Sequence, residues 1–432
     1  MKTFAVAVVL SPLALAGVAG ADVVTQWNQM TLESIRASAT PPPFASRGMA
    51  MVHTAVYDAV NSISTARQPY KFFESVSSTA SKEAAAAQAA RDVLVSLYPS
   101  RQSIFDAQLA NDLAGIADGP DKTAGINCGS TIAFKVINSR AGDGSTNAPS
   151  YSSGSNPGDW QPTPPAFSPT PLFQQFAAVT PWTMSSNAQF RQGPPAAVTS
   201  AEYTAAYNEV KELGRVDSAT RTAEQTDIAR LWAAGGGTVT PPGQWNTIAQ
   251  QLGTSQGNTI EENARMFALL NLATADAALV AWDMKAHYDF WRPVTGIRAG
   301  DTDGNPDTVG DASWAPLLAT PNFQAYTSGH STFSGAASSV LAAFFGTDLL
   351  NFSLTADDVA ITRNFTSLSG AADEAGKSRI YGGIHWEFDN SVGLLSGRQL
   401  GGYIFENFLA VPTPGAVSVM AVIGLAGLRR RR

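Results

Sequence analysis

The sequence predicts an all-α protein. Strand signals are scarce among its 432 residues, and long alanine-rich stretches carry apolar residues at helical spacing. The apolar content of 44% is ample for the core of a large helical bundle. The clearest helical pattern lies between Glu261 and Trp291, at these positions: Met266, Leu269, Leu270, Ala273, Ala277 and Val280.

Eight stretches are predicted as helices, in chain order: Arg47–Ile63, Ser81–Leu97, Ser103–Ala117, Ala201–Leu213, Ala223–Ala233, Glu261–Trp291, Ser331–Phe345 and Val392–Leu409. Pro293 is expected to end the sixth of them. A long segment from Ala141 to Pro195 interrupts the series, and its prolines exclude helix. Because it also holds large aromatic residues, we expect it either to cover the mouth of a site or to wrap the surface as an insertion.

Both ends of the chain have the composition of targeting segments. Lys2, an apolar run and small residues at 19–21 predict a signal peptide over residues 1–21. At the other end, Val-Pro-Thr-Pro-Gly at 411–415 precedes an apolar run and four arginines. This layout resembles a PEP-CTERM sorting tail over residues 411–432, which membrane sorting machinery recognises. We therefore expect export to the cell envelope or the medium, and one helical domain over residues 22–410.

The charge balance argues against one class of partner. The chain has 28 Lys and Arg against 35 Asp and Glu, and removing Lys2 and the four terminal arginines leaves 23 against 35. A body this acidic is a poor nucleic-acid binder, because phosphate contacts require a positive surface. Cys128 is the only cysteine, so no disulfide can form within the chain.

The first motif, KAHYDFWRP at 285–293, carries Lys285 and Arg292. Seven residues of helix turn by about 700°, within roughly 20° of two full turns, so both side chains would share one face. Two cations on one face repel each other unless an anion lies between them or each reaches a carboxylate. Asp289, four residues after Lys285, offers the simpler alternative of a surface salt bridge.

The second motif is Ser328-Gly329-His330, directly before an apolar helix. Unpaired N–H groups at a helix start suit an oxyanion, Gly329 lets the backbone come close, and Ser328 adds a hydroxyl donor. A serine N-cap would by itself also explain Ser328. His330 would lie in a first turn whose dipole opposes its protonation, so it fits best as a group that exchanges protons.

The third motif, RIYGGIHWEFD at 379–389, carries Arg379 and His385 on either side of Gly382-Gly383. This break lets the two side chains converge. Asp389, four residues after His385, is placed to accept one ring N–H and leave the other nitrogen free as ligand or nucleophile. The two remaining histidines, His53 and His287, are predicted to be structural.

In this order and spacing, KxxxxxxRP, SGH and RxxxxxHxxxD resemble the superfamily of vanadium-dependent haloperoxidases, type 2 phosphatidic acid phosphatases and bacterial acid phosphatases. The segments DFWRPVTGIR (289–298) and SRIYGGIHWEFD (378–389) are most similar to vanadium chloroperoxidases, and RGMAMVHTAVYDAVN (47–61) to bacterial haloperoxidase-like proteins. The resemblance implies the helical bundle of that superfamily, with catalytic motifs between residues 282 and 389. Thr327 departs from it, since the family usually has proline before SGH, which would loosen the turn.

The resemblance also implies the cofactor and a role for each motif residue. The cofactor is vanadate, or phosphate in a phosphatase, and its oxygens would be held by Lys285, Arg292, Ser328, Gly329 and Arg379. His385 would bind the metal with Asp389 behind it, and the remaining catalytic roles fall to His330 as acid–base group and Lys285, which polarises peroxide. Trp282 and Phe323 match aromatic positions of a chloroperoxidase-like halide pocket. The implied partners are hydrogen peroxide, a halide and a small organic acceptor.

Three functions remain open on the sequence alone. A haloperoxidase that makes hypohalous acid is favoured by Trp282 and Phe323. An acid phosphatase would attack phosphorus with His385, forming a phosphohistidine, and protonate the leaving group with His330. A non-catalytic exported surface protein would have no need of five converging ionisable groups.

The segment Asp301–Asp307 is similar to half of a calcium loop but lacks the closing glutamate, so a polar turn is predicted there.

Overall fold

The computed structural model describes residues 22–152 and 154–411. The predicted signal peptide, and all of the predicted sorting tail except Val411, lie outside these residues. The fold is mostly helical, with 58% helix and 3% strand. The predicted all-α class is confirmed.

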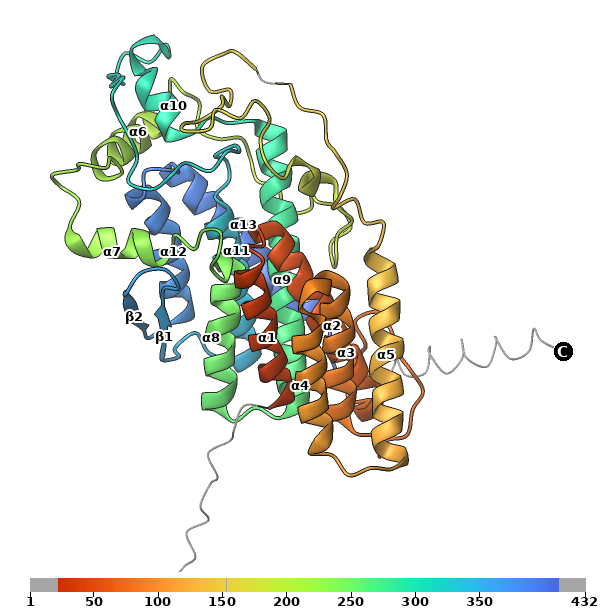
Figure 1. Ribbon diagram of the computed structural model, residues 1–432. Helices are drawn as coiled ribbons and strands as arrows, with labels where there is room; N and C mark the ends of the chain where they lie inside the picture. Colours follow the sequence, from red (N-terminus) through yellow and green to blue (C-terminus); the bar gives the residue numbers. More distant parts are fainter. Residues whose placement is uncertain (1–21, 153, 412–432) are drawn as a thin grey trace, which may run out of the picture.

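The N-terminal helices form one bundle, seen in red and orange in Figure 1. It contains α1 (Val23–Ala37), α2 (Pro42–Ser64), α3 (Lys82–Leu97), α4 (Gln102–Ala114) and α5 (Pro120–Arg140). Small residues let α3 and α5 pack closely: a Cβ on Gly125 or Gly129 would lie 2.3 Å or 2.4 Å from a backbone oxygen of the α3 region. The alanines of α3 therefore serve close helix packing as well as helix propensity.

Helix α9 (Ile260–Tyr288) is the central element of the molecule. Thr259 and Glu262 form a capping box at its start, and Asp289 ends it in the left-handed conformation at φ 48°. Every residue from Asn263 to Lys285 is buried, because α2 packs on one side of the helix and α11 on another. By length and composition α9 could cross a membrane, but its apolar window is wholly buried inside the protein, as a core helix would be.

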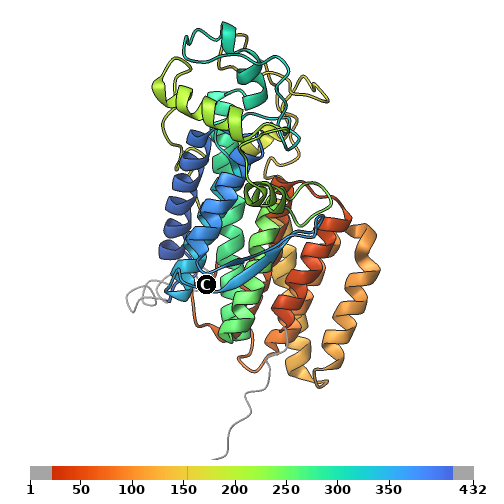
Figure 2. The ribbon, with the colours of Figure 1, turned by 90° about the vertical axis from the view of Figure 1, so that its left-hand side faces the viewer.

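The C-terminal helices form a second bundle with α9. They are α11 (Gly329–Phe345), α12 (Leu368–Tyr381) and α13 (Glu387–Asn407), with α8 (Thr240–Gln256) packed on α9 and α11. Helices α11 and α13 approach closely at Gly397, where a Cβ would lie 2.3 Å from the oxygen of Thr332. A short antiparallel pair, β1 (Phe352–Thr355) and β2 (Thr362–Phe365), connects α11 to α12 and crosses the front of Figure 2.

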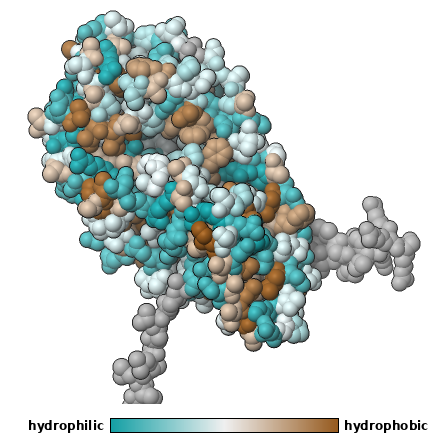
Figure 3. All heavy atoms as spheres, viewed as in Figure 1, coloured by the Kyte–Doolittle hydropathy of each residue, from teal (hydrophilic) through white to brown (hydrophobic). Residues whose placement is uncertain are grey.

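The remaining elements are short. The 3-10 turn η1 (Pro99–Arg101) joins α3 to α4, and η2 (Gln174–Ala178) lies in the long connection between α5 and α6. Helices α6 (Ala201–Leu213) and α7 (Ala223–Leu231) precede α8, and α10 (Pro293–Arg298) and η3 (Gly300–Thr302) follow α9. Helices α6 and α10 lie together at the top of Figure 1. On the face shown in Figure 3, apolar residues gather in several separate patches with hydrophilic residues between them.

All eight predicted helices are present, with ends shifted by a few residues, but one predicted boundary is wrong. Helix α9 ends at Tyr288, so Arg292 does not share a helix face with Lys285; it is the extended residue before α10. Pro293 starts that helix, because the first helical position needs no N–H donor. The sequence patterns also missed helices α1, α5, α8, α10 and α12.

Candidate anion-binding active site

The three motifs meet where α9, α11 and the α12–α13 connection come together. Lys285 lies in the last turn of α9, His330 in the first turn of α11 and Arg379 in the last turn of α12. Arg292 and His385 lie in the connections before α10 and α13. Three of these side chains, those of His330, Arg379 and His385, line one cavity of about 50 Å³. A water molecule needs roughly 10–15 Å³ on this measure, so the space suits a small ion with a few oxygens.

The cavity has a polar side and an apolar side. The polar side is formed by the two histidines, the arginine and the backbone of Gly329. The apolar side contains prolines, aromatic rings and one aliphatic residue: Pro42, Pro241, Pro321, Trp282, Phe323, Phe333 and Ile384. Such walls keep water away from the polar groups and strengthen electrostatic interactions among them.

The ring nitrogens of His385 have distinct roles. Nδ1 lies 2.8 Å from Oδ2 of Asp389, and Nε2 lies 3.0 Å from Nη1 of Arg292. Because a guanidinium can only donate, Nε2 carries a lone pair and the proton is on Nδ1, directed at the carboxylate. Burial lowers the pKa of His385 well below 6.5, and the neighbouring cations lower it further. The ring is therefore neutral, with Nε2 as its acceptor atom.

Asp389 is fully buried beneath this histidine. Its Oδ2 also accepts the backbone N–H of Trp386 at 3.1 Å. Burial raises the pKa of Asp389 to about 7, against the opposing effects of the Trp386 N–H and the charges of Lys285 and Arg292. The charges of Lys285 and Arg292 act on this one acidic group, and with Arg379 they form a cluster of three buried cations whose charges all lower the pKa of His385. The cluster carries excess positive charge.

Arg292 and Arg379 use some of their N–H donors in hydrogen bonds to backbone carbonyls and leave others unpaired. Arg292 donates to the carbonyls of Phe323 and Ile384 at 2.6 Å and 2.7 Å, and Arg379 donates to that of Trp232 at 3.2 Å. Nη2 of Arg292 and Nε of Arg379 are buried and have no hydrogen-bond partner in the described part of the chain. Burial lowers the pKa of each to about 9, so both remain cations at neutral pH. Buried unpaired N–H groups are costly, and an anion would satisfy them.

Lys285 is completely buried, and its ammonium already donates hydrogen bonds to backbone carbonyls. Nζ donates to three backbone carbonyls at 2.8, 3.0 and 2.6 Å, those of Gln324, Ala325 and Thr327. The alternative salt bridge with Asp289 does not form, because that carboxylate accepts from Tyr151 and Gln324. Burial and the charge of Arg292 lower the pKa of Lys285. It lies beside the cavity and not in its wall, so its contact with an oxyanion stays a prediction.

The SGH turn is fixed from both sides. Ser328 caps α11, because its hydroxyl oxygen accepts from the N–H of Ser331 at 3.3 Å. This is the N-cap role that the sequence predicted as the simpler alternative to an oxyanion donor. Gly329 lines the cavity, and a Cβ there would meet only ring atoms, at 3.8 Å and beyond. Thr327 tightens the turn instead of loosening it: its hydroxyl donates to the carbonyl of Asp389 at 2.6 Å, a bond that proline could not make.

His330 is oriented by a residue that the sequence did not reveal. Its Nε2 lies 2.9 Å from the carbonyl oxygen of Trp232, which also accepts from Arg379. Since a carbonyl only accepts, the proton is on Nε2. With the proton on Nε2, Nδ1 carries the lone pair of the neutral ring. Burial and the charge of Arg379 lower the pKa of His330 well below 6.5. A backbone carbonyl has no sequence signature, so no pattern could have pointed to Trp232.

Part of the long connection packs on the aromatic side of the cavity. The rings of Trp282 and Phe323 lie 5.2 Å apart, and Phe173 lies 6.1 Å and 6.4 Å from them. The indole N–H of Trp282 donates to the carbonyl of Leu172 at 3.3 Å. This part of the connection therefore packs against two of the rings that line the cavity, but none of the described residues between 141 and 195 lines the cavity itself, so a cover over its mouth stays a prediction.

The other singled-out residues lie outside the site. His53 donates from Nε2 to Asn28 at 3.1 Å and stacks on Phe267, so it is a core residue, and His287 is exposed. In the loop from 301 to 307, Asp303 accepts from Thr308, as a polar turn requires. In residues 22–152 and 154–411, no group of three or more His, Cys, Asp or Glu side chains could hold a metal ion.

Known proteins match this chain in sequence and in fold. Residues 265–412 match the family described as VCPO second helical-bundle domain. Vanadium chloroperoxidase of Curvularia inaequalis is 28% identical, over 72% of this chain and 63% of that protein, so the chain spans less than two thirds of this relative.

Solved structures extend the match over most of the described chain. The structure described as the first bacterial vanadium-dependent iodoperoxidase is 26% identical, with a TM-score of 0.76 over 91% of this chain and 97% of that one. A holo-type bacterial vanadium-dependent chloroperoxidase shares the fold at 18% identity, with a TM-score of 0.68 over 85% and 92%. The chain is thus similar in sequence and in fold to vanadium-dependent haloperoxidases.

Proposed function

We propose that the protein is a vanadate-dependent haloperoxidase that uses hydrogen peroxide to oxidise a halide to hypohalous acid. One observation carries the proposal. Nε2 of the buried, neutral His385 presents a lone pair beside guanidinium groups that still hold unpaired N–H donors. This combination suits a metal oxyanion, which needs one nitrogen ligand and several hydrogen-bond donors around it.

The residues of the site fit vanadate. His385 would bind the metal through Nε2, and Arg292, Arg379, Ser328 and the Gly329 N–H would hold its oxygens. Lys285 would contribute charge from beside the cavity and would reach an oxygen only by releasing a carbonyl. When bound, vanadate supplies Lewis-acid chemistry for the oxidation of halide by peroxide.

His330 is the proposed proton carrier. Its Nε2–H is committed to the Trp232 carbonyl. Nδ1 would therefore take a proton from hydrogen peroxide entering the cavity and return it to the hydroxide that the peroxide replaces, which would leave as water. Burial lowers the pKa of His330 well below 6.5, so the ring is neutral at neutral pH and returns an accepted proton readily.

Trp282 and Phe323 form the proposed halide side of the cavity. Their apolar rings would remove water from the halide as it approaches, and we keep the expectation of a chloroperoxidase-like pocket. The similar solved structures are named as an iodoperoxidase and a chloroperoxidase, so the preference has to be measured with chloride, bromide and iodide. We further propose that the protein is exported, and that the product halogenates a small organic acceptor.

A phosphatase is the second candidate, favoured by the same unprotonated Nε2, which accepts from Arg292. In that case His385 would attack phosphorus as a nucleophile, and the arginines would hold the phosphate oxygens. The third possibility, a non-catalytic surface protein, is disfavoured because buried, unpaired arginine donors cost stability without a ligand.

Two assays run side by side distinguish the three functions. The purified protein is given orthovanadate and tested for bromination of a phenolic dye with bromide and peroxide, and separately for hydrolysis of p-nitrophenyl phosphate. Halogenation that requires vanadate and is lost in His385→Ala supports the haloperoxidase. Hydrolysis without halogenation supports the phosphatase, and the absence of both activities and of vanadate binding rejects both enzymes. Glu406→Gln, an exposed change on α13, is the matched control.

A further inference from the structure

One backbone carbonyl serves two side chains of the candidate active site. The oxygen of Trp232 accepts from Nε2 of His330 at 2.9 Å and from Nη1 of Arg379 at 3.2 Å. Trp232 is the C-cap of α7, and the carbonyls at the end of a helix have no partner within that helix. This oxygen is therefore available to the site, and its direction depends on what holds Trp232 in place.

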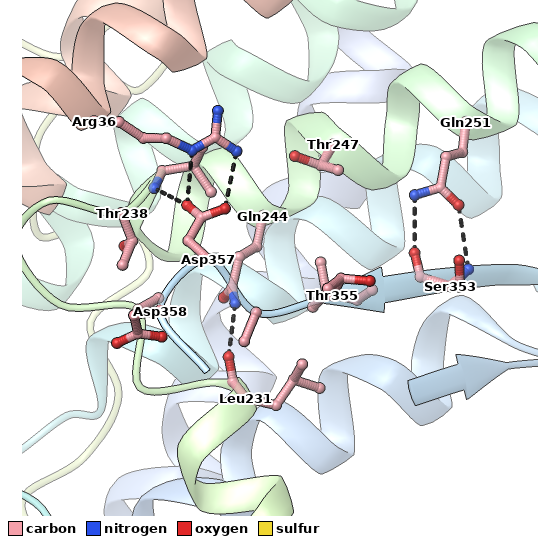
Figure 4. A pocket seen from close by; sticks show the side chains of 14 residues that line it. Arg36, Leu231, Thr238, Gln244, Thr247, Gln251, Ser353, Thr355, Asp357 and Asp358 are labelled. Carbon is pink, nitrogen blue, oxygen red and sulfur yellow. Dashed lines mark hydrogen bonds and ion pairs between the residues drawn. The ribbon is translucent and has the colours of Figure 1, made fainter. Parts of the chain in front are cut away.

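The chain on either side of Trp232 is weakly held by itself. Helix α7 has only nine residues, and a helix this short is marginal without tertiary contacts. The carbonyl of its last residue, Leu231, accepts Nε2 of Gln244 at 2.9 Å (Figure 4). After Trp232, residues 233–237 are Ala-Ala-Gly-Gly-Gly, which have no polar side chain that could hold the backbone. The last anchor before this segment is the side chain of Trp232.

The indole of Trp232 is fixed by Glu374 on α12. Its Nε1 donates to Oε1 of Glu374 at 3.1 Å, and the buried ring packs on Trp245 and Phe365, at 6.3 Å and 6.0 Å between ring centroids. The two rings restrict where the indole lies, and the hydrogen bond fixes how it is turned. The buried indole of Trp160, in contrast, has no hydrogen-bond partner in the described residues, so burial alone does not impose such a bond in this protein.

The carboxylate of Glu374 is itself oriented by an arginine. Arg363 on β2 donates to it from Nε and from Nη2, both at 2.8 Å, a two-pronged geometry that orients a carboxylate. The same arginine reaches Glu224 on α7 at 3.1 Å. The side chain of Glu224 is 69% exposed, whereas that of Glu374 is 15% exposed. Glu374 therefore presents a fixed, largely buried oxygen to the indole, and Glu224 is its matched surface counterpart.

We propose that Glu374 is a positioning residue: by holding the indole of Trp232, it aims the carbonyl that keeps the proton of His330 on Nε2. The hydrogen bond at one ring nitrogen determines which nitrogen carries the proton, so Nδ1 keeps its lone pair. This role rests on the proposed haloperoxidase function, in which that lone pair takes the proton of hydrogen peroxide. The contact itself involves neither vanadate nor halide, so contact and function can be tested apart.

Ring ¹⁵N NMR of the full-length protein, labelled on histidine, reads the tautomer of His330 directly. The chain has four histidines, and His330→Gln identifies the resonances of this one. In the wild type at neutral pH we expect a protonated Nε2 and an unprotonated Nδ1. Glu374→Leu removes the acceptor at similar size and should give an exchanging mixture of both tautomers. Glu374→Gln keeps an acceptor oxygen and should preserve the wild-type spectrum.

Two further variants isolate the contact. Trp232→Phe breaks the same hydrogen bond from the other side, leaves the ion pair of Arg363 and Glu374 in place, and decides the question if Glu374→Leu does not fold. It should give the same mixture of tautomers. Glu224→Leu removes the other carboxylate of the same arginine and should leave the spectrum unchanged. The wild-type tautomer in Trp232→Phe and in folded Glu374→Leu, or an equal mixture in Glu224→Leu, would overturn the proposal.

Halogenation kinetics connect the contact to catalysis. In Glu374→Leu we expect kcat/KM for hydrogen peroxide to fall about tenfold, part of the roughly 100- to 10,000-fold that a well-placed proton carrier supplies. Glu374→Gln should restore the value, and Glu224→Leu should keep it. A mixed tautomer with unchanged kcat/KM would overturn the catalytic role of the contact. A wild type that has the Nε2 tautomer but no vanadate-dependent halogenation would instead reject the proposed function, while the NMR spectra still decide whether Glu374 orients His330.

Discussion

Asp389 lies in the first turn of α13 and accepts the proton of Nδ1 of His385, which precedes that helix, at 2.8 Å. This single contact determines which ring nitrogen faces the arginines. Because the two residues are four positions apart in the chain, the local path of the chain into α13 brings them together. Their burial then makes the contact stronger than a similar pair on the surface would be.

Replacing Asp389 with Asn should therefore impair the site without unfolding the protein. The amide can donate to Nδ1 and favour the other tautomer, which places a proton on Nε2 and removes its lone pair. We expect vanadate affinity to fall by about 10- to 100-fold. Calorimetry with orthovanadate measures the change, and Glu406→Gln on the same helix is the control. An Asp389→Asn protein that binds vanadate as the wild type does would refute the assigned tautomer.

Gly329 and Gly397 allow a comparison of two alanine substitutions. A Cβ at Gly329 would meet only ring atoms at 3.8 and 3.9 Å, whereas one at Gly397 would lie 2.3 Å from a backbone oxygen. Gly329→Ala should keep the melting temperature and weaken vanadate binding, because the new methyl group enters the cavity. Gly397→Ala should lower the free energy of unfolding by about 1–3 kcal/mol by forcing α11 and α13 apart. Thermal and urea unfolding measure both, and the reverse ranking would contradict the cavity geometry.

His53 predicts a pH dependence of stability. Burial lowers its pKa from 6.5 to about 3. Between these values the unfolded chain binds a proton that the folded protein does not, so stability falls as the pH drops below 6.5. The slope for one group is about 1.4 kcal/mol per pH unit. Between pH 7 and pH 5, His53→Gln should therefore lose about 2 kcal/mol less than the wild type in urea unfolding. Identical losses would show that His53 does not carry the effect.

Asp276 anchors the long connection to the central helix. Its carboxylate, fully buried on α9, accepts the N–H groups of Trp182 and Thr183, both at 2.8 Å. Asp276→Asn removes the charge from these bonds, and we expect a loss of about 1.5–3 kcal/mol in unfolding free energy. Chymotrypsin should also cleave the variant faster between residues 160 and 182. Asp307→Asn, an exposed change, should leave the cleavage rate unaltered, and equal rates in both variants would argue against the anchor.

Features that depend on neighbours along the chain could be predicted. The apolar periodicity of residues 261–291 indicated the central helix, although the helix ends at 288, and the four-residue spacing of His385 and Asp389 indicated their contact. The serine cap of α11 followed from the preference of helix starts for short oxygen-bearing side chains. The convergence of the motifs was inferred from their resemblance to a family, because no local rule connects residues 285, 330 and 385.

What each side chain does after convergence was decided by tertiary structure. The left-handed Asp289 ended α9 early and turned Arg292 out of the helix, so its place in the site comes from contacts with Phe323 and Ile384. The carbonyl of Trp232, nearly 100 positions before His330, fixes that imidazole. Sequence patterns record side-chain chemistry at short range, whereas backbone carbonyls are the same in every residue. Only the folded chain determines which of them reach the site.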